Sequence, residues 1–316
     1  MSSIVDLLGR GLSNPDQIIP FLKRKSGVNP WGWRGPSIKM AEMRYKLTDY
    51  PYPTTSIWNE DWDLLVILDA CRTEWMMGVA DDYDFIDNVD TIHSVGSHSK
   101  EWITKTFDDK YSQTLSDTIY ITGNHYADNL DESKLEAFET AHNYGGWAYD
   151  SASPPANVIT DLAVQAARNN NWERCVVHYM QPHKPFFTKT ESRGDFSVQE
   201  WSLGYQPYRE FFSGNITREQ LNTSFQSNLN YVLNEVELLL ENVDASDVVL
   251  TADHGQALGE NGLWDHTIGV KHPSMRRVPW VETTASDEHT LDPDDYDKSQ
   301  YDEELVESNL RDLGYM

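Results

Sequence analysis

DLLVILD, at residues 63–69, is one of three short β-branched runs that decide the fold of this chain; the others are CVVHYM at 175–180 and DVVLTADHG at 247–255. Such runs are typical of strands that are buried on both faces, as in a parallel sheet covered by helices. Parallel strands bring their C-terminal ends to one edge of the sheet, where α/β proteins place their chemistry. We therefore expect the carboxylates and imidazoles that end these runs to meet at that edge.

Strand and helix signals alternate from residue 61 onward. The expected strands cover residues 63–69, 118–122, 175–180 and 247–252, and the expected helices lie near 99–108, 132–142, 157–170 and 218–242. Alternation of this kind predicts an α/β fold with a doubly wound, mainly parallel sheet that is sandwiched by helices.

The chain divides into three predicted parts. Residues 1–60, rich in proline and aromatic residues, would form a lead-in packed on the core, residues 61–282 would form the α/β domain, and residues 283–316 would form an acidic tail. Within the domain, residues 184–215 are rich in aromatic residues and glycine without clear periodicity, so we expect a lid or substrate loop there.

Charge is the second strong signal in the sequence. There are 51 acidic and 25 basic residues, for a net charge of −26, and the excess is not confined to the tail. Self-repulsion on this scale is relieved by screening in concentrated salt, so we expect a halophilic protein. Such a surface disfavours nucleic-acid binding, although residues 1–60 hold a local basic group.

Cysteine usage and hydropathy indicate the compartment. Cys71 and Cys175 are the only cysteines and lie beside or within predicted buried strands, so reduced packing thiols are expected rather than a disulfide. No run of about 18 apolar residues marks a membrane span, and the opening residues lack the pattern of a secretion signal. These features predict a cytoplasmic protein without an integral membrane segment; the oligomeric state stays open.

Asp253-His254-Gly255 ends the third run. A carboxylate and an imidazole in succession at a strand end can face one divalent cation, and glycine lets the backbone turn away without blocking the site. Asp69, at the end of the first run, supplies a further anionic ligand, and this donor set suits one Mg²⁺, Ca²⁺, Mn²⁺ or Zn²⁺ ion. Alternatively, Asp69 and Asp253 are turn or helix-cap residues.

Four segments resemble, in order and spacing, the sulfatase branch of the alkaline phosphatase superfamily. They are VILDACR at 66–72, HYMQPHKPF at 178–186, TADHGQALGENG at 251–262 and RVPW at 277–280. The resemblance implies a doubly wound α/β sandwich, a bound divalent metal, and attack on a phosphate or sulfate ester through a covalent enzyme intermediate. By position, it implies that Asp69, Asp253 and His254 are metal ligands. With the acidic composition, it favours a sulfatase-like protein of the halophilic-archaeon type.

The nucleophile of the family is a Ser, Thr or cysteine-derived formylglycine at the start of a helix. Ser99 stands best for this position, where it would also be a metal ligand, and Ser97 stands second. A cation and a helix N-terminus would both stabilise the alkoxide of such a serine. Alternatively, these serines only cap the helix.

The residues after Ser99 depart from the sulfatase pattern. They are Lys100-Glu101-Trp102, without the Pro and Arg that direct formylglycine formation in sulfatases. An unmodified serine favours phosphoryl over sulfuryl transfer, so a phosphate monoester or diester is the preferred substrate.

Four further residues are implied to meet the substrate by their places in the resemblance. His183 would contact the ester or the leaving group, and His266, Lys271 and His272 lie where the family has a basic residue near the leaving-group oxygen. A protonated imidazole or an ammonium group there would stabilise the transferred anion or give a proton to the departing alkoxide. The same histidines allow a second metal ion, and the alternative for each is an ordinary surface histidine.

These features together favour a metal-dependent hydrolase of phosphate or sulfate esters that acts on a small molecule or glycan through a serine nucleophile. A head-group phosphoryl transferase acting on glycans or lipids would use the same residues. A catalytically inactive relative that binds anionic glycans is the third alternative. Metal content separates this last one, because a binding protein need not hold a stoichiometric divalent ion.

Overall fold

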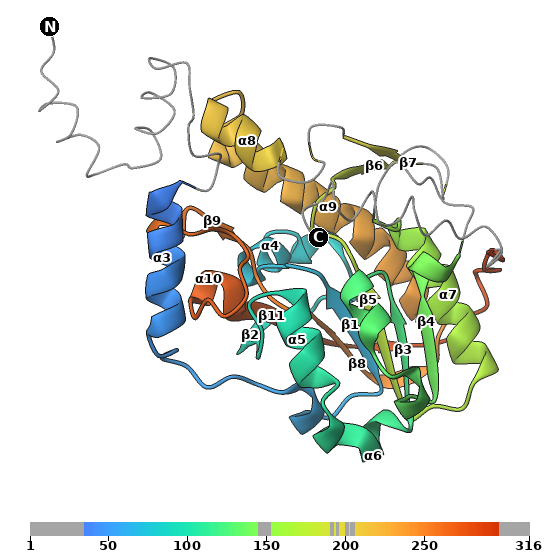
Figure 1. Cartoon of the computed structure of the whole chain (residues 1–316). Coiled ribbons are helices and arrows are strands. Elements are labelled where there is room, and N and C mark those ends of the chain that lie inside the picture. The colour runs from blue at the N-terminus through green and yellow to red at the C-terminus, as the bar shows by residue number, and fades with distance from the viewer. Residues whose placement is uncertain are drawn as a thin grey trace, which may run out of the picture.

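The computed structural model describes residues 35–144, 153–189, 193, 196–199, 202 and 206–296. Its centre is a seven-stranded sheet with the strand order β2-β11-β8-β1-β5-β3-β4 (Figure 1). These strands are β1 (Leu64–Leu68), β2 (Asp90–His93), β3 (Thr118–Thr122), β4 (Ala137–Thr140), β5 (Arg174–Tyr179), β8 (Ala245–Thr251) and β11 (Arg277–Ala285). Two small sheets pair β6 (Phe187–Lys189) with β7 (Phe196–Val198) and β9 (Ala257–Leu258) with β10 (Trp264–Asp265).

The α-helices of the described residues surround this sheet (Figure 1). They are α3 (Pro36–Leu47), α4 (Thr73–Met77), α5 (Ser99–Thr106), α6 (Ser112–Leu115), α7 (Ala156–Asn169), α8 (Gln206–Ser213), α9 (Arg218–Leu240) and α10 (Pro273–Arg276). Within the part of the chain that the structure describes, no helix combines the length and the apolar character needed to cross a bilayer.

The central sheet is mainly parallel. β1 pairs in parallel with β5 on one side and with β8 on the other, and β3 pairs in parallel with β5 and β4. β11 is antiparallel to both β8 and β2, which makes the sheet mixed at this side. The predicted α/β fold with a mainly parallel sheet sandwiched by helices is therefore confirmed.

Alternate side chains of β1 enter two different cores. Leu64 and Val66 pack in a cluster that includes residues of α7 and α9, whereas Leu65 and Ile67 pack in a cluster that includes residues of α5. Successive strand residues point to opposite faces, so helices on both faces require an unbroken apolar run. All residues of β1 are 0% exposed, as this arrangement demands.

Most of the expected elements are observed with ends within about two residues of those predicted. The helix expected near 132–142 is wrong, because this stretch forms a 3-10 turn at Glu132–Lys134, strand β4, and a second 3-10 turn at Ala141–Asn143. β4 pairs with β3 from Ile119↔Ala137 to Thr122↔Thr140. This pairing overrides the local helical preference of the segment.

β2 and β11 are absent from the sequence prediction. β11 contains Pro279 and ends in the stretch VETTA at 281–285, so it lacks the apolar run that marks the other long strands. It pairs with β8 as far as Ala285, past the predicted domain boundary at 282. The three-part division stays a prediction, since residues 1–34 and 297–316 lie outside the described residues.

Residues 184–215 are described only in part. The described residues include β6, β7 and α8, and Phe186, Phe187 and Tyr208 are buried there. Several of these aromatic residues therefore belong to the core, and the lid role stays a prediction.

Phe225 of α9 offers a test of the packing between α4 and α9. It is 0% exposed and stacks on Trp75 of α4, with ring centroids 4.7 Å apart. Phe225→Ala is expected to lower the free energy of unfolding by about 3–5 kcal/mol because it leaves a cavity. Urea denaturation followed by circular dichroism measures this loss. Ile268→Ala, at a side chain that is 44% exposed, is the control, and equally small losses in both variants would contradict this packing.

Candidate active site

Two carboxylates reach the same point because their strands are neighbours. β1 and β8 pair in parallel up to Ile67↔Thr251, and an aspartate follows two residues later in each case, Asp69 and Asp253. Ala70 takes a left-handed φ of 63°, and its N–H donates to Asp253 Oδ1 at 3.1 Å. This hydrogen bond ties the end of β1 to the end of β8.

Gly255 allows the backbone after His254 to pass close to the backbone of α10. Its N–H donates to Met275 O at 3.0 Å, and a Cβ on Gly255 would lie 2.6 Å from Ser274 O of α10. A side chain at this position would force α10 to move. The glycine after the aspartate and the histidine thus serves the close approach of two backbones.

Asp69, Asp253 and His254 form a buried group, here called the first cluster, whose ligand atoms lie within 4.8 Å of one another. His254 Nε2 lies 3.6 Å from Asp69 Oδ1 and 3.4 Å from Asp253 Oδ2. Ser99, the first residue of α5, places its Oγ 3.1 Å from Asp69 Oδ2 and 3.2 Å from His254 Nε2. The structure thus brings together the four residues that the sequence predicts as metal ligands.

Some polar atoms around the first cluster lack a hydrogen-bond partner among the described residues, although they are buried. They include Asp69 Oδ1, Asp253 Oδ2 and His178 Nε2. His178 Nε2 lies 3.9 Å from Asp253 Oδ2, so these atoms face a common space. Buried polar atoms are nearly always paired in folded proteins. Two carboxylate oxygens and an imidazole nitrogen around one space are donors that fit a cation.

His254 presents an acceptor nitrogen to the carboxylates. Its Nδ1 lies 2.8 Å from Gly255 O. A carbonyl oxygen only accepts, so Nδ1 carries a proton, and in the neutral form of the ring Nε2 carries a lone pair. A lone pair facing two carboxylates is unfavourable unless a cation lies between them, because the one hydrogen of the Ser99 hydroxyl is donated to Asp69 Oδ2.

Electrostatics lead to the same conclusion. Burial and the neighbouring charge of Asp253 raise the pKa of Asp69 well above its ordinary value. Burial also acts to raise the pKa of Asp253, but the imidazoles of His254 and His178 outweigh it, and this pKa is lowered. The two carboxylates therefore cannot both ionise easily without a counter-charge. Oxygen donors with one nitrogen fit a divalent ion such as Mg²⁺, Ca²⁺, Mn²⁺ or Zn²⁺.

Asn124 and His178 complete the surroundings of the two carboxylates, and sequence reasoning did not single them out. Asn124 follows β3, and its Nδ2 donates to Asp69 Oδ2 at 3.0 Å. His178 lies near the end of β5, and its Nδ1 is 3.0 Å from the Tyr120 hydroxyl. Their place in the sequence could have indicated them, because both lie at or just after the C-terminal end of a parallel strand.

Ser97, the second candidate nucleophile, is held elsewhere. Its Oγ lies 2.9 Å from Glu101 Oε2 and 2.9 Å from Thr267 O. It therefore joins the loop before α5 to the loop after His266. Of the two serines, only Ser99 lies within hydrogen-bonding distance of the first cluster.

His183, Asp265 and His266 form a second buried group, here called the second cluster, whose ligand atoms also lie within 4.8 Å of one another. The ring centroids of His266 and His254 are 4.6 Å apart, so the two clusters are adjacent. Lys184 Nζ lies 3.9 Å from Asp265 Oδ1. Sequence reasoning missed Asp265, although it directly precedes His266, and missed Lys184, which directly follows His183.

The imidazoles of the second cluster are neutral in the absence of an added charge. Burial lowers the pKa of His266 to about 4 and the pKa of His183 well below its ordinary value. Neutral rings are suited to accept a proton or bind a metal, and the protonated imidazole expected from the sequence stays a prediction. The buried cation at this place is Lys184, which is 4% exposed.

Lys271 and His272 have contacts outside both clusters. His272 caps α10, with its Nδ1 2.8 Å from Ser274 Oγ, and its Nε2 lies 2.9 Å from Asn261 Nδ2. The backbone N–H of Lys271 donates to Tyr45 O of α3 at 2.9 Å. Neither side chain has a contact with the two clusters in the described residues, so their substrate-binding role is not supported by this geometry.

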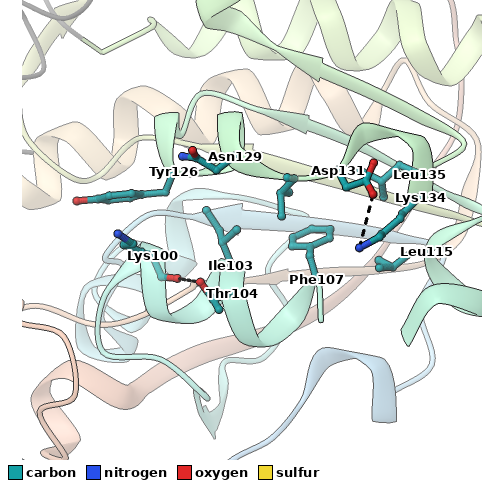
Figure 2. Close-up of a pocket in the computed structure, with 11 residues that line it drawn as sticks. Lys100, Ile103, Thr104, Phe107, Leu115, Tyr126, Asn129, Asp131, Lys134 and Leu135 are labelled. Atoms are coloured by element: carbon teal, nitrogen blue, oxygen red, sulfur yellow. Dashed lines mark hydrogen bonds and ion pairs between the residues drawn. The ribbon is translucent and has the colours of Figure 1, made fainter. Parts of the chain in front are cut away.

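A groove runs along α5 away from Ser99. It has a volume of about 480 Å³, and Ile103, Phe107 and Leu115 contribute to its apolar lining (Figure 2). Lys100 and Tyr126 line the same groove, and the ring of Tyr126 lies 5.2 Å from that of His98, the residue before Ser99. The groove therefore adjoins the residue before Ser99, and the residues that line it belong to neither cluster.

Comparison with known proteins finds distant structural similarity. No protein-family model and no curated protein matches the sequence. Similar solved structures include the soluble domain of lipooligosaccharide phosphoethanolamine transferase A from Neisseria meningitidis, with 15% identity, coverage of 75% of this chain and 79% of that chain, and a TM-score of 0.44. The C-terminal periplasmic domain of phosphoethanolamine transferase EptC from Campylobacter jejuni has 16% identity, coverage of 73% and 82%, and a TM-score of 0.44.

A protein in the alkaline phosphatase superfamily from Vibrio parahaemolyticus has 10% identity, coverage of 82% of this chain and 69% of that chain, and a TM-score of 0.40. Similarity at these levels does not establish membership in a family. The chemistry proposed below therefore rests on the geometry of this chain.

Asp69→Asn separates two effects expected of the first cluster. One is the destabilisation by its buried charge without metal, and the other is the stabilisation by a bound divalent ion. In metal-free protein, the substitution removes a charge that burial and Asp253 disfavour, while the amide oxygen can still accept from Ser99 and Asn124. The unfolding midpoint is expected to rise by about 2–4 °C. A divalent ion should raise the midpoint of the wild type through binding to the folded state, but not that of the variant.

Differential scanning calorimetry with EDTA, and then with Mg²⁺, Mn²⁺, Ca²⁺ or Zn²⁺, measures both effects. Asp247→Asn is the matched control. It changes an exposed carboxylate on β8, the strand that leads to Asp253, and should behave as the wild type. An equal metal-dependent rise in Asp69→Asn and the wild type would contradict shared coordination.

Proposed function

We propose that this protein cleaves phosphate or sulfate esters, with Ser99 as the nucleophile and with a divalent ion held by Asp69, Asp253 and His254. The observation that supports this proposal most directly is the set of buried atoms without partners that face one space beside Ser99 Oγ. A structural cluster would satisfy these atoms within the protein. A site that leaves them facing one another has the donors that a cation needs.

The residues of the first cluster would orient the nucleophile. Asp69 Oδ2 lies 3.1 Å from Ser99 Oγ and accepts a hydrogen bond from it, which directs the hydroxyl oxygen. The divalent ion, when bound, would stabilise the serine alkoxide and the negative charge of the ester oxygens. Ser99 also stands at the N-terminus of α5, where the helix dipole favours negative charge.

The reaction would proceed in two displacements. Ser99 would give its proton to Asp69 Oδ2, and its Oγ would form a bond to the phosphorus or sulfur atom while the bond from that atom to the alcohol oxygen breaks. The departing alcohol oxygen would take a proton from solvent. Water then attacks the enzyme ester, and the bond to Ser99 Oγ breaks. His266 of the second cluster, whose ring centroid lies 4.6 Å from that of His254, would accept the proton of this water, and Ser99 Oγ would recover its proton from Asp69.

Phosphate esters are the preferred substrates. Ser99 is followed by Lys100-Glu101-Trp102, which lacks the Pro and Arg that direct formylglycine formation in sulfatases. The nucleophile would therefore act as an unmodified serine. This favours phosphoryl over sulfuryl transfer.

The groove beside Ser99 supports a second candidate, transfer of a phosphoryl-linked group to an alcohol. The apolar portion of an acceptor could lie along Ile103 and Phe107, which line this groove (Figure 2). Such an acceptor would replace water in the second displacement. The same Ser99 intermediate serves both outcomes, so the residues of the two clusters do not separate them.

Ser99→Ala tests the proposed nucleophile. It is expected to lower turnover of an aryl phosphate monoester, an aryl phosphodiester or an aryl sulfate by at least about a thousandfold, because no other hydroxyl replaces the attacking oxygen. Initial rates are measured with metal-loaded protein in high salt. A phosphoryl adduct on the peptide that contains Ser99, trapped at low pH and found by mass spectrometry, would show the intermediate directly.

Ser97→Ala is the matched control, since Ser97 is a buried serine of the same loop whose Oγ binds Glu101 and Thr267. It should keep rates within about tenfold of the wild type. Unchanged turnover in Ser99→Ala would overturn the assignment. Stoichiometric metal without turnover of any ester would favour transfer to an untested acceptor, and absence of metal would favour the binding-only alternative.

A further inference from the structure

Helix α3 carries an exposed apolar face, formed by Met40, Met43 and Leu47. These side chains are 72%, 64% and 80% exposed. Their i, i+3, i+7 spacing places them within about 60° of one another around the helix. The opposite side of α3 is buried through Ile38 and Glu42, so the helix packs on the protein with one side and presents a second, apolar face that the described residues leave exposed.

Three cations flank the apolar face. At about 100° per residue, Arg44 falls on one side of the face and Lys39 and Lys46 fall on the other, and all three are exposed. The acidic residue of α3, Glu42, is turned inward and accepts a hydrogen bond from Thr267 at 3.1 Å. The outward surface of α3 is therefore apolar with basic margins.

The charge of this region is opposite to that of the rest of the chain. Residues 1–47 contain eight of the 25 basic residues but three of the 51 acidic ones. Solubility does not explain a basic helix on this protein, because acidic residues serve solubility better than basic ones. An exposed apolar stripe between cations is a feature of helices that lie in the interface of an anionic membrane.

We propose that α3 binds the surface of an anionic lipid membrane, with its apolar face among the headgroups and the flanking cations against the lipid phosphates. Charge complementarity favours this occupant, because each Lys or Arg near an anionic bilayer strengthens binding about fivefold. The apolar face supplies the part of the affinity that salt does not screen. This binding is independent of the chemistry at Ser99.

Docking through α3 would orient the candidate active site. α3 packs beside β9 and α10 (Figure 1) and contacts the loop that follows the second cluster. Glu42 binds Thr267, the residue after His266, and Tyr45 O accepts from Lys271 N–H at 2.9 Å. Because a helix with its side chains is about 10 Å across, this loop would lie close to the bilayer surface.

Co-sedimentation of the full-length protein with vesicles tests the proposal. At about 0.15 M salt, the wild type should sediment with phosphatidylglycerol vesicles and not with phosphatidylcholine vesicles. Replacing the apolar face with Met40→Ser, Met43→Ser and Leu47→Ser should weaken binding at least about tenfold. Replacing the flanking cations with Gln should weaken it about a hundredfold.

Met77→Ser is the matched control, because Met77 is a methionine that is 54% exposed on another helix, α4. It should bind as the wild type does, and circular dichroism should show that every variant is folded. Failure of the wild type to bind anionic vesicles, or equal binding by the variant without the apolar face, would overturn the proposal. A wild-type dimer that this variant converts to monomer, with no vesicle binding, would instead assign the face to a second copy of the chain.

Discussion

The parallel pairing of β1 with β8 is the constraint on which the rest of the structure depends. It carries Asp69 and Asp253 into one buried space, where each charge costs several kcal/mol unless it is compensated. The compensation within the protein is partial: Ser99 and Asn124 bind one oxygen of Asp69, and backbone N–H groups bind one oxygen of Asp253. The remaining oxygens face the same space. A fold with such a pair is expected to gain stability when a cation binds to these oxygens.

Glu101, a half-buried acid, connects two loops of the site. Glu101 of α5 accepts hydrogen bonds from the N–H of Ser97 and of Gly269 and pairs with Arg276 of α10 at 2.9 Å. Burial disfavours this charge, but a hydrogen bond from Lys105 and the charge of Arg276 lower the pKa of Glu101 to about 2. The loop before Ser99 and the loop after His266 are thus fixed to one carboxylate. Glu101 therefore fixes the position of Ser99 relative to the second cluster.

Sequence reasoning succeeded where one local pattern determined the position of a residue. The run at 63–69 had to be a buried strand, and Asp69 and Asp253 then had to meet at its edge. It failed where contacts between residues distant in the sequence determine the structure. β4, for example, is a strand because it pairs with β3. His178 was missed because its neighbour Asp253 lies at the end of another strand, and Asp265 was missed because its neighbours His183 and Lys184 are distant in the sequence. The halophilic setting and the cytoplasmic location stay predictions.

Charge distribution connects the site with the surface around it. A chain of net charge −26 repels an anionic ester, so approach requires local positive charge. Positive charge lies at two distances from the site. Close to the clusters, Lys184 is buried beside Asp265, and Lys100 lines the groove that begins next to Ser99. Farther out, the basic margins of α3 border the loop after His266. A divalent ion between Asp69 and Asp253 would complete this gradient, because the attacking oxygen would then lie at its most positive point.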